Sequence, residues 1–379
     1  MADIENIIFF ERNVFMKEHK LENFEAIMCL IMISIANIVL ISSNILIKDT
    51  NSASLITTLF ISIIAFILTL ILCLLSKNFL GQTLIDISNF LGGKFLKLII
   101  AFCFVGYFVF TISIFLKKMS DAMQTIYYPL TNTVFINALF CLSCGIIASL
   151  KNHSLFKSMV LLVPFLYWAV ILIFIGNGKN FNFENIYPLL GNGIKATFLS
   201  GLSNIYSFSG LVYLFLLPSK LKHPEKISKI GLIFVTISTI YLFFCIANIL
   251  FLFGDSIKSY ELPPLYISVR YIEFGTFFQR LDAAFIFICV LGFICALNIN
   301  LYFILDILKD TLNISNKNIL IAPCLLICFG ISLCIKQNST LEFLENTFSK
   351  ILYFIFAFAI PLTIMTFASL KKKKIGGNF

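Results

Sequence analysis

The residues best suited to bind a small molecule lie in two stretches of otherwise apolar sequence. SIANIVLISSN (residues 34–44) and SGLSNIYSFSG (residues 200–210) are rich in hydroxyl and amide side chains. Such groups hydrogen-bond carboxylates and ammonium groups alike. Where a helix breaks, its freed N–H and C=O groups and the dipoles of the two half-helices add to that capacity. Both stretches therefore predict a site for a small polar ligand.

Tight packing of small residues between membrane helices is the alternative interpretation of both stretches. The second stretch contains two glycines and six hydroxyl or amide side chains, more than close packing needs. We expect a broken helix there, and also in the first stretch, which has no glycine to mark the position of the break. The residues predicted to form the ligand site are Asn37, Ser42, Tyr107, Gly201, Ser203, Asn204, Tyr206 and Ser207.

Four charged residues, Arg270, Glu273, Arg280 and Asp282, stand at the mouth of a long apolar run. Charges so close to a membrane-spanning segment are costly unless they lie in protein or in water. In a continuous helix the first three would share an arc of about 80° on one face. One interpretation is a structural clamp, with Arg270 paired to Glu273, on an extracytoplasmic loop that gates the ligand site. The other is snorkelling of the arginines to the interface.

The composition predicts an all-helical integral membrane protein. Hydrophobic residues make up 59% of the 379 positions and charged residues only 12%, and the mean hydropathy is +0.98. A soluble domain contains about 25% charged residues. Long apolar runs favour helices, and alternating strands typical of a barrel are absent. The charged first 24 residues do not have the pattern of a signal peptide, so the first span is expected to be retained.

Ten apolar segments are long enough, or nearly so, to cross about 30 Å of hydrocarbon. They are residues 25–47, 53–75, 96–115, 133–150, 155–176, 196–217, 230–253, 281–307, 318–335 and 351–370. No segment between them is long enough for a soluble domain. We therefore expect residues 1–379 to form a single polytopic membrane domain.

The two polar stretches fall in the first and the sixth of the ten spans, which are corresponding members of two five-helix halves. An odd number of helices in each half inverts the second half relative to the first. Matching interruptions in two such halves are the best sequence pointer to a ligand site at the bilayer midplane. The sequence predicts a LeuT-like fold of two inverted repeats, residues 25–177 and 196–370.

Lysine and arginine are most frequent in the loops that lie on one side when both termini are cytoplasmic. This bias predicts cytoplasmic termini. It also explains the net charge of +9, because KLKHPEK and the terminal KKKK then serve as positive-inside anchors, and nucleic-acid binding is not expected. The eleven cysteines lie in apolar spans, where they are expected to pack as small apolar residues. No catalytic, metal or cofactor motif is found, so we expect neither an enzyme nor a cofactor.

Two motifs resemble a known family. ENIYPLLGNGIKATFLSG (184–201), followed by LLP at 216–218, resembles the entry and exit of the sixth helix in B subunits of bacterial spore germinant receptors (GerAB type). RYIEFGTFFQRLDAAFIF (270–287) resembles the family's pattern before and into the eighth helix. The family belongs to the amino acid–polyamine–organocation transporter superfamily. Relatives in that superfamily usually break the first helix at glycine, and this sequence departs from that pattern.

The resemblance implies a receptor subunit in the inner membrane of a dormant spore. Such a subunit binds a small nutrient, typically an amino acid, and signals germination together with A and C partner subunits. The residues alone reach only a membrane protein with a polar midplane site, which also fits an ion-coupled amino acid permease or, less well, a scaffold without a ligand. Sequence does not divide receptor from permease, because both use one fold.

Overall fold

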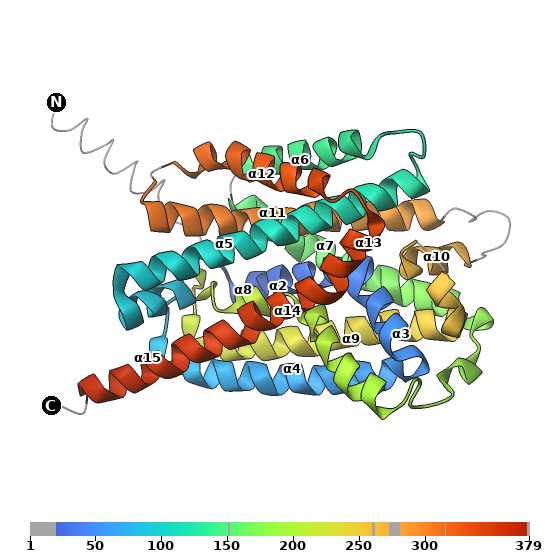
Figure 1. The fold of residues 1–379 in the computed structure, drawn as a ribbon, viewed down its shortest axis with the longest axis horizontal. Helices are drawn as coiled ribbons and strands as arrows, with labels where there is room; N and C mark the ends of the chain where they lie inside the picture. The colour runs from blue at the N-terminus through green and yellow to red at the C-terminus, as the bar shows by residue number, and fades with distance from the viewer. Residues whose placement is uncertain (1–19, 151, 260–261, 273–280, 315, 377–379) are drawn as a thin grey trace.

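The computed structural model describes residues 20–150, 152–259, 262–272, 281–314 and 316–376, and these residues form a bundle of helices without strands (Figure 1). The bounds are α2 (Asn23–Asn37), α3 (Ser43–Thr50), α4 (Ser54–Ser76), α5 (Leu84–Ile126), α6 (Thr133–Ser149), α7 (Asn152–Gly176), α8 (Leu211–Leu214), α9 (Ile227–Phe253), α10 (Pro264–Arg270), α11 (Leu281–Leu312), α12 (Ile321–Cys334), α13 (Asn338–Phe343), α14 (Ser349–Phe354) and α15 (Ile360–Gly376).

Seven helical stretches of the described residues are long and apolar enough to cross a membrane. The first stretch, Asn23–Phe79, contains the first two predicted spans, and α6 is a shorter apolar helix. The sixth predicted span is not among the seven, because residues 195–217 form short irregular helical turns. The prediction of a multi-pass, all-helical membrane protein is confirmed. The ten-span inverted repeat stays a prediction.

Helix α2 lies at the centre of the bundle and packs against α7, α9 and α11 (Figure 1). Every residue from Glu25 to Asn37 is buried. A helix enclosed on all sides is apolar all round, and α2 departs from this rule mainly at Ser34 and Asn37, both fully buried. Polar groups in that position need partners inside the protein.

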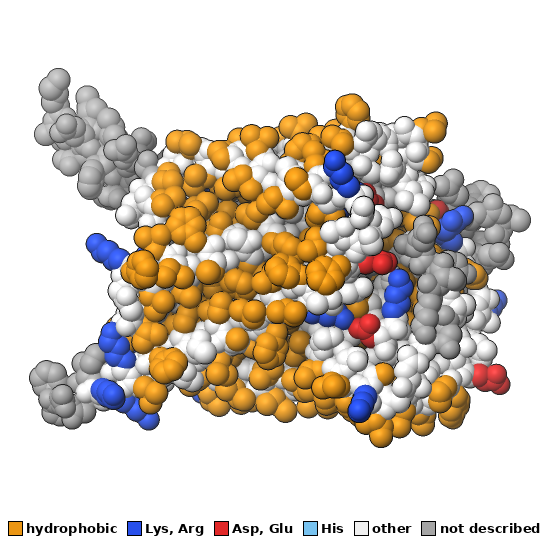
Figure 2. Space-filling model, viewed as in Figure 1, with side chains coloured by type: hydrophobic (Ala, Val, Ile, Leu, Met, Phe, Trp, Pro, Cys, Tyr) orange, Lys and Arg blue, Asp and Glu red, His pale blue; other side chains and the backbone are white. Residues whose placement is uncertain are grey.

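One end of the bundle joins segments that are far apart in the sequence. Leu21 N donates to Lys220 O, and Lys222 pairs with Glu22. Lys371 and Lys372 of α15 donate to carbonyl oxygens of residues 78, 90 and 91. We call this the basic end. The first and last described residues both lie there (Figure 1), whereas a broad apolar band covers the middle of the face in Figure 2.

The segment that carries the charged motif is not one continuous helix. Helix α10 ends at Arg270, and Tyr271 and Ile272 are not helical. The continuous helix on which a shared face of Arg270, Glu273 and Arg280 depended is therefore interrupted at Tyr271 and Ile272. Glu273 and Arg280 themselves lie outside the described residues. Pro263 and Pro264 explain where the short helix starts, since proline favours the first turn of a helix.

Candidate functional site

A π-helical turn, Ile38–Ser42, stands where the sequence predicted a break in the first span. It joins α2 to α3, and the backbone at both of its caps is helical. The stretch has neither glycine nor proline, the residues that most often interrupt a helix. A π turn adds one residue to the turn without breaking the chain's path, and such turns are frequent at functional sites.

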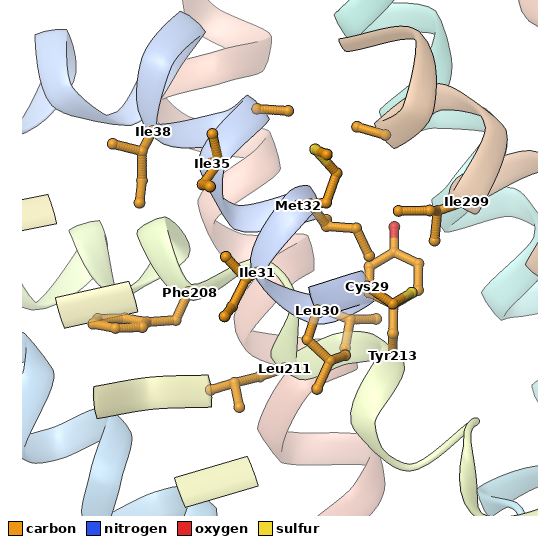
Figure 3. Close-up of a cluster of buried hydrophobic side chains, with 14 of the residues drawn as sticks. Cys29, Leu30, Ile31, Met32, Ile35, Ile38, Phe208, Leu211, Tyr213 and Ile299 are labelled. Carbon is orange, nitrogen blue, oxygen red and sulfur yellow. The ribbon is translucent and has the colours of Figure 1, made fainter. Parts of the chain in front are cut away.

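The sixth predicted span is irregular along its whole length. A π turn, Lys195–Ser200, is followed by a 3₁₀ segment, Ser203–Phe208, and then by the four residues of α8. Runs of 3₁₀ helix this long are uncommon and often mark a hinge or a strained sequence. In Figure 3, Phe208 and Leu211 from this region lie beside Ile31 and Leu30 of α2. Residues 195–214 are called the irregular segment below.

Side chains of neighbouring helices bind backbone groups of the irregular segment. Asn37 Nδ2 donates to Tyr206 O at 2.8 Å, and Gly210 N donates to Ser34 Oγ at 3.0 Å. Tyr353 OH, from α14, donates to Phe208 O at 3.0 Å. Irregular backbone leaves N–H and C=O groups without helical partners, and burial makes such groups costly unless they are bonded. These bonds join the irregular segment to α2 and α14, whereas the ligand site expected on the first and sixth spans stays a prediction.

Glycines allow this close approach. A Cβ at Gly210 would lie 2.3 Å from Leu30 O, and a Cβ at Gly201 would lie 2.5 Å from Thr57 Cγ2. The first of these contacts is with backbone, which cannot move aside as a flexible side chain can. Glycine is therefore required at position 210, where the irregular segment passes α2. Gly201 lies against Thr57 of α4.

The predicted ligand residues do not all meet in one place. Asn37, Ser42, Asn204, Tyr206 and Ser207 are buried, whereas Ser203 is exposed. Ser207 Oγ donates locally to Asn204 O at 2.9 Å. Two residues lie apart from the bonds that join α2 to the irregular segment: Ser42 Oγ is buried without a protein partner, and Tyr107 of α5 stacks on Phe356 with ring centroids 4.8 Å apart.

Asn204 and Ser203 belong to a polar cluster that sequence reasoning missed. Asp49 Oδ2, at the end of α3, accepts from Lys350 Nζ at 2.8 Å and from Asn204 Nδ2 at 3.0 Å. Lys350 Nζ also donates to Ser203 Oγ at 3.2 Å. The Lys350 side chain is 8% exposed and that of Asp49 is 32% exposed. We call these four residues the clasp, because they join the first, sixth and last spans.

A second buried ion pair lies near the clasp in sequence. Lys118 Nζ, from α5, is 3.0 Å from Glu345 Oε2, which lies in the π turn Leu344–Phe348. The Glu345 side chain is only 4% exposed. Both lysines of these pairs stand next to the ends of predicted spans. Their partners are 227 and 301 positions away in the sequence, so no signal in the sequence indicates that they pair.

An apolar cavity lies on another face of α2. It encloses about 610 Å³ including its mouth and is bounded by α2, α5, α7, α10 and α11. Met32, Ala36 and Leu40, spaced four residues apart, line it, whereas the neighbouring Asn37 bonds to the irregular segment. None of the eight predicted ligand residues lines this cavity.

The structure describes two of the four predicted gating residues, Arg270 and Asp282. Arg270 is exposed at the end of α10, and Asp282 is buried in the first turn of α11. Glu273 and Arg280 lie outside the described residues, so the proposed Arg270–Glu273 pair stays a prediction. Among the described residues, no group of three His, Cys, Asp or Glu side chains is placed to hold a metal ion.

The irregular segment and the segment around α10 carry the two motifs that suggested a family, and a family comparison decides the matter. A sequence model described as "Spore germination protein" matches residues 20–341. The chain belongs to this family. The resemblance predicted from the two motifs is confirmed, because both fall inside the matched range. A search of curated proteins gave no match to the chain. The family contains membrane proteins of permease or receptor type, in agreement with the apolar helices described above.

Proposed function

We propose that this protein is the membrane subunit of a spore germinant receptor. It binds a small nutrient, an amino acid by preference, between the first span and the irregular segment. Binding changes the packing of these two elements, and A and C partner subunits transmit the change in the spore inner membrane. The ligand site comprises the eight predicted residues, within two inverted repeats, residues 25–177 and 196–370, with cytoplasmic termini.

One observation carries this proposal: side chains of α2 and α14 form hydrogen bonds with backbone groups of the irregular segment. The carboxylate of an amino acid can accept from the Gly210 N–H group that Ser34 now satisfies, and its ammonium group can donate to the two carbonyl groups that Asn37 and Tyr353 now satisfy. Each such bond contributes about 0.5–1.5 kcal/mol. A ligand that replaces two or three of them with charge-assisted bonds therefore favours a different arrangement of the two elements.

A receptor needs a ligand that binds one conformation more tightly than the other. A ligand with equal affinity for both states shifts nothing, whereas a shift from 1:99 to 99:1 needs about 10⁴-fold preference. The summed free energy of several hydrogen bonds exchanged together at the irregular segment is of the right order to supply such a preference. Because the clasp joins the same segment to the first and last spans, the change also reaches the far end of the bundle.

An ion-coupled amino acid permease of the same superfamily is the alternative function. It is favoured by the same irregular segment, because a transport cycle needs the same relative motion of two halves. Carboxylates that sequence reasoning had not placed, Asp49 and Glu345, are present near the spans' ends, although each is paired with a lysine. The two functions therefore differ in what the protein does with its ligand, and not in the architecture.

Uptake by the purified protein in liposomes separates the two functions. Each proteinogenic L-amino acid, radiolabelled, is tested singly for binding and for accumulation under imposed Na⁺ or H⁺ gradients. We expect saturable binding of at least one amino acid without net uptake. Sustained, gradient-driven accumulation in the absence of A and C subunits would show that the protein is a permease.

Matched variants test the location of the site. Asn37→Leu removes the amide that bonds to Tyr206 O, and Asn318→Leu makes the same change at an exposed residue before α12. We expect Asn37→Leu to change affinity about 5- to 150-fold, the equivalent of 1–3 kcal/mol, and Asn318→Leu to leave affinity unchanged. Equal affinities for both variants and the unmodified protein would place the ligand elsewhere.

A further inference from the structure

A pocket at the basic end combines positive charge with exposed apolar surface. It is formed where α4 ends, where α5 begins and along α15, and it encloses about 1130 Å³ including its wide mouth. Its lining residues are Lys77, Asn78, Phe79, Leu80, Gln82, Phe90 and Lys372. No acidic side chain is among these lining residues, so the pocket presents only positive charge, amide groups and rings.

The last helix is fixed to one wall of this pocket by specific contacts. Lys372 Nζ donates to Asn78 O at 2.7 Å and lies 5.3 Å from the centre of the Phe79 ring. Lys371 Nζ donates to Phe90 O at 2.8 Å and lies 5.2 Å from the centre of that ring. Cation–π contacts and hydrogen bonds together hold the two lysines in defined positions. The positive wall is therefore built into the fold.

A second lysine lines the same pocket. Lys77 follows the end of α4 in a short 3₁₀ turn, and its side chain is exposed. Gln82, also exposed, lines the pocket as well. An exposed ammonium group and an exposed amide in an open pocket are available to an anion. A single phosphate group can accept from several such donors at once.

The pocket lies where the apolar surface of the bundle gives way to lysines. Leu80 is 58% and Phe90 is 39% exposed, and Figure 2 shows Lys and Arg side chains at this edge of the apolar band. Beyond the pocket, Lys373 and Lys374 complete a turn of four lysines on α15. Basic clusters directly next to a membrane helix attract anionic lipids, by about 1 kcal/mol for each lysine. A bilayer surface is thus the environment of this pocket.

We propose that the pocket binds the head group of an anionic glycerophospholipid. The phosphate lies between Lys77 and Lys372, the Gln82 amide donates to the head group, and the acyl chains extend over Leu80 and Phe90. A free anion would not contact the exposed apolar residues, whereas a lipid contacts the polar residues with its phosphate and the apolar residues with its acyl chains. The lipid would hold the last helix against the loop between α4 and α5.

Native mass spectrometry of the purified full-length chain tests this proposal. The protein is exchanged into nanodiscs of phosphatidylglycerol and phosphatidylcholine in equal amounts and then released, and the retained lipids are counted. We expect phosphatidylglycerol to be retained in preference to phosphatidylcholine. Lys77→Gln is expected to weaken this retention about 10- to 150-fold, because it removes a charge-assisted bond to the phosphate. Because Lys77 is exposed, its replacement leaves the fold intact, as helix content and melting temperature can verify.

Lys373→Gln is the matched control, since it removes one exposed lysine from the same end of the protein without touching the pocket lining. It is expected to weaken the retention of phosphatidylglycerol by about 5-fold at most, the effect of removing any one interfacial lysine. Equal retention of the two lipids, or equal loss in both variants, would overturn the proposal. Displacement of the lipid by millimolar inorganic phosphate would assign the site to a free anion. Protection of Lys77 from acetylation by partner subunits but not by phosphatidylglycerol vesicles would assign the site to a protein.

Discussion

Substitution of Asp49 and substitution of Lys350 in the clasp should destabilise the protein by unequal amounts. Asp49→Asn leaves the Lys350 ammonium with 8% exposure and no counter-charge, so water cannot replace the lost partner. Lys350→Met leaves Asp49, whose side chain is 32% exposed and still accepts from Asn204. Removing one partner of a buried pair costs about 3–5 kcal/mol, while an exposed pair contributes only about 0–1 kcal/mol. The two variants should fall at different points of this range.

We expect Asp49→Asn to lower the free energy of unfolding by about 3 kcal/mol, because it strands a buried charge. Lys350→Met should lower it by about 1 kcal/mol, since methionine keeps most of the packing of the lysine stem and the carboxylate can turn to water. In the double variant the buried charge is absent, so the total cost should again be about 1 kcal/mol. The coupling between the two positions is then about 3 kcal/mol.

Titration with a denaturing detergent, followed by helical ellipticity, measures all four proteins in one mild-detergent background. Lys336→Met, at an exposed lysine just after α12, is a control for the loss of a lysine. The reasoning fails if Lys350→Met costs as much as Asp49→Asn. It fails equally if the effects of the single variants simply add within about 0.5 kcal/mol, the limit for independent sites.

Four further predictions concern the irregular segment and the second ion pair. Gly210→Ala should lower the yield of folded protein, since its Cβ would lie 2.3 Å from a backbone oxygen, whereas Gly106→Ala, which meets open space, should not. Gly201→Leu, which collides with Thr57, should shift the nutrient concentration dependence of spore germination, and an unchanged dependence would mean that the ligand site is misplaced. Tyr353→Phe removes the donor to Phe208 O and should destabilise the protein in the same titration by about 1–3 kcal/mol; a difference below about 0.5 kcal/mol would contradict this. Glu345→Gln should cost more stability than Asp121→Asn, because the Glu345 side chain is 4% exposed and that of Asp121, paired with Lys117 one turn away, is 26% exposed. The reverse order would argue against burial as the cause.

The class of protein and most helices could be predicted from the sequence because hydrocarbon leaves few alternatives. A chain that spans a membrane must satisfy its backbone groups within helices, so long apolar runs identify them. The predicted span 230–253 lies within α9, and the predicted span 53–75 nearly coincides with α4. Helix α5 instead continues to Ile126, beyond the predicted end at residue 115, because Lys117 pairs with Asp121 one turn later and does not end the helix.

The polar contacts between distant segments could not be predicted in the same way. Asp49 and Lys350 are 301 positions apart, and each, taken alone, resembles an interfacial charge at the end of a span. The polar stretch around Asn37 predicted an interruption, but the residues of the π turn itself, IVLIS, are as apolar as the helix before it and do not indicate the type of turn or its bounds. The two polar stretches did indicate which spans meet. They did not indicate that Asn37 and Ser34 of the first stretch bond to backbone groups of the irregular segment and not to the polar side chains of that segment.

The π turn Ile38–Ser42 sets the rotational phase between the two ends of the first span. Each residue of an α-helix advances the chain by about 100° around the helix axis. Deleting one residue from this turn would restore a regular helix and rotate α3 by about that angle relative to α2. Asn37 would still face the irregular segment, but Asp49 would turn away from Lys350. Conversely, if the extra residue migrated along the helix, the side chains it passed would change faces one after another while both ends stayed in place. Migration of the π turn would therefore change the contacts of the first span without sliding the span through the bundle.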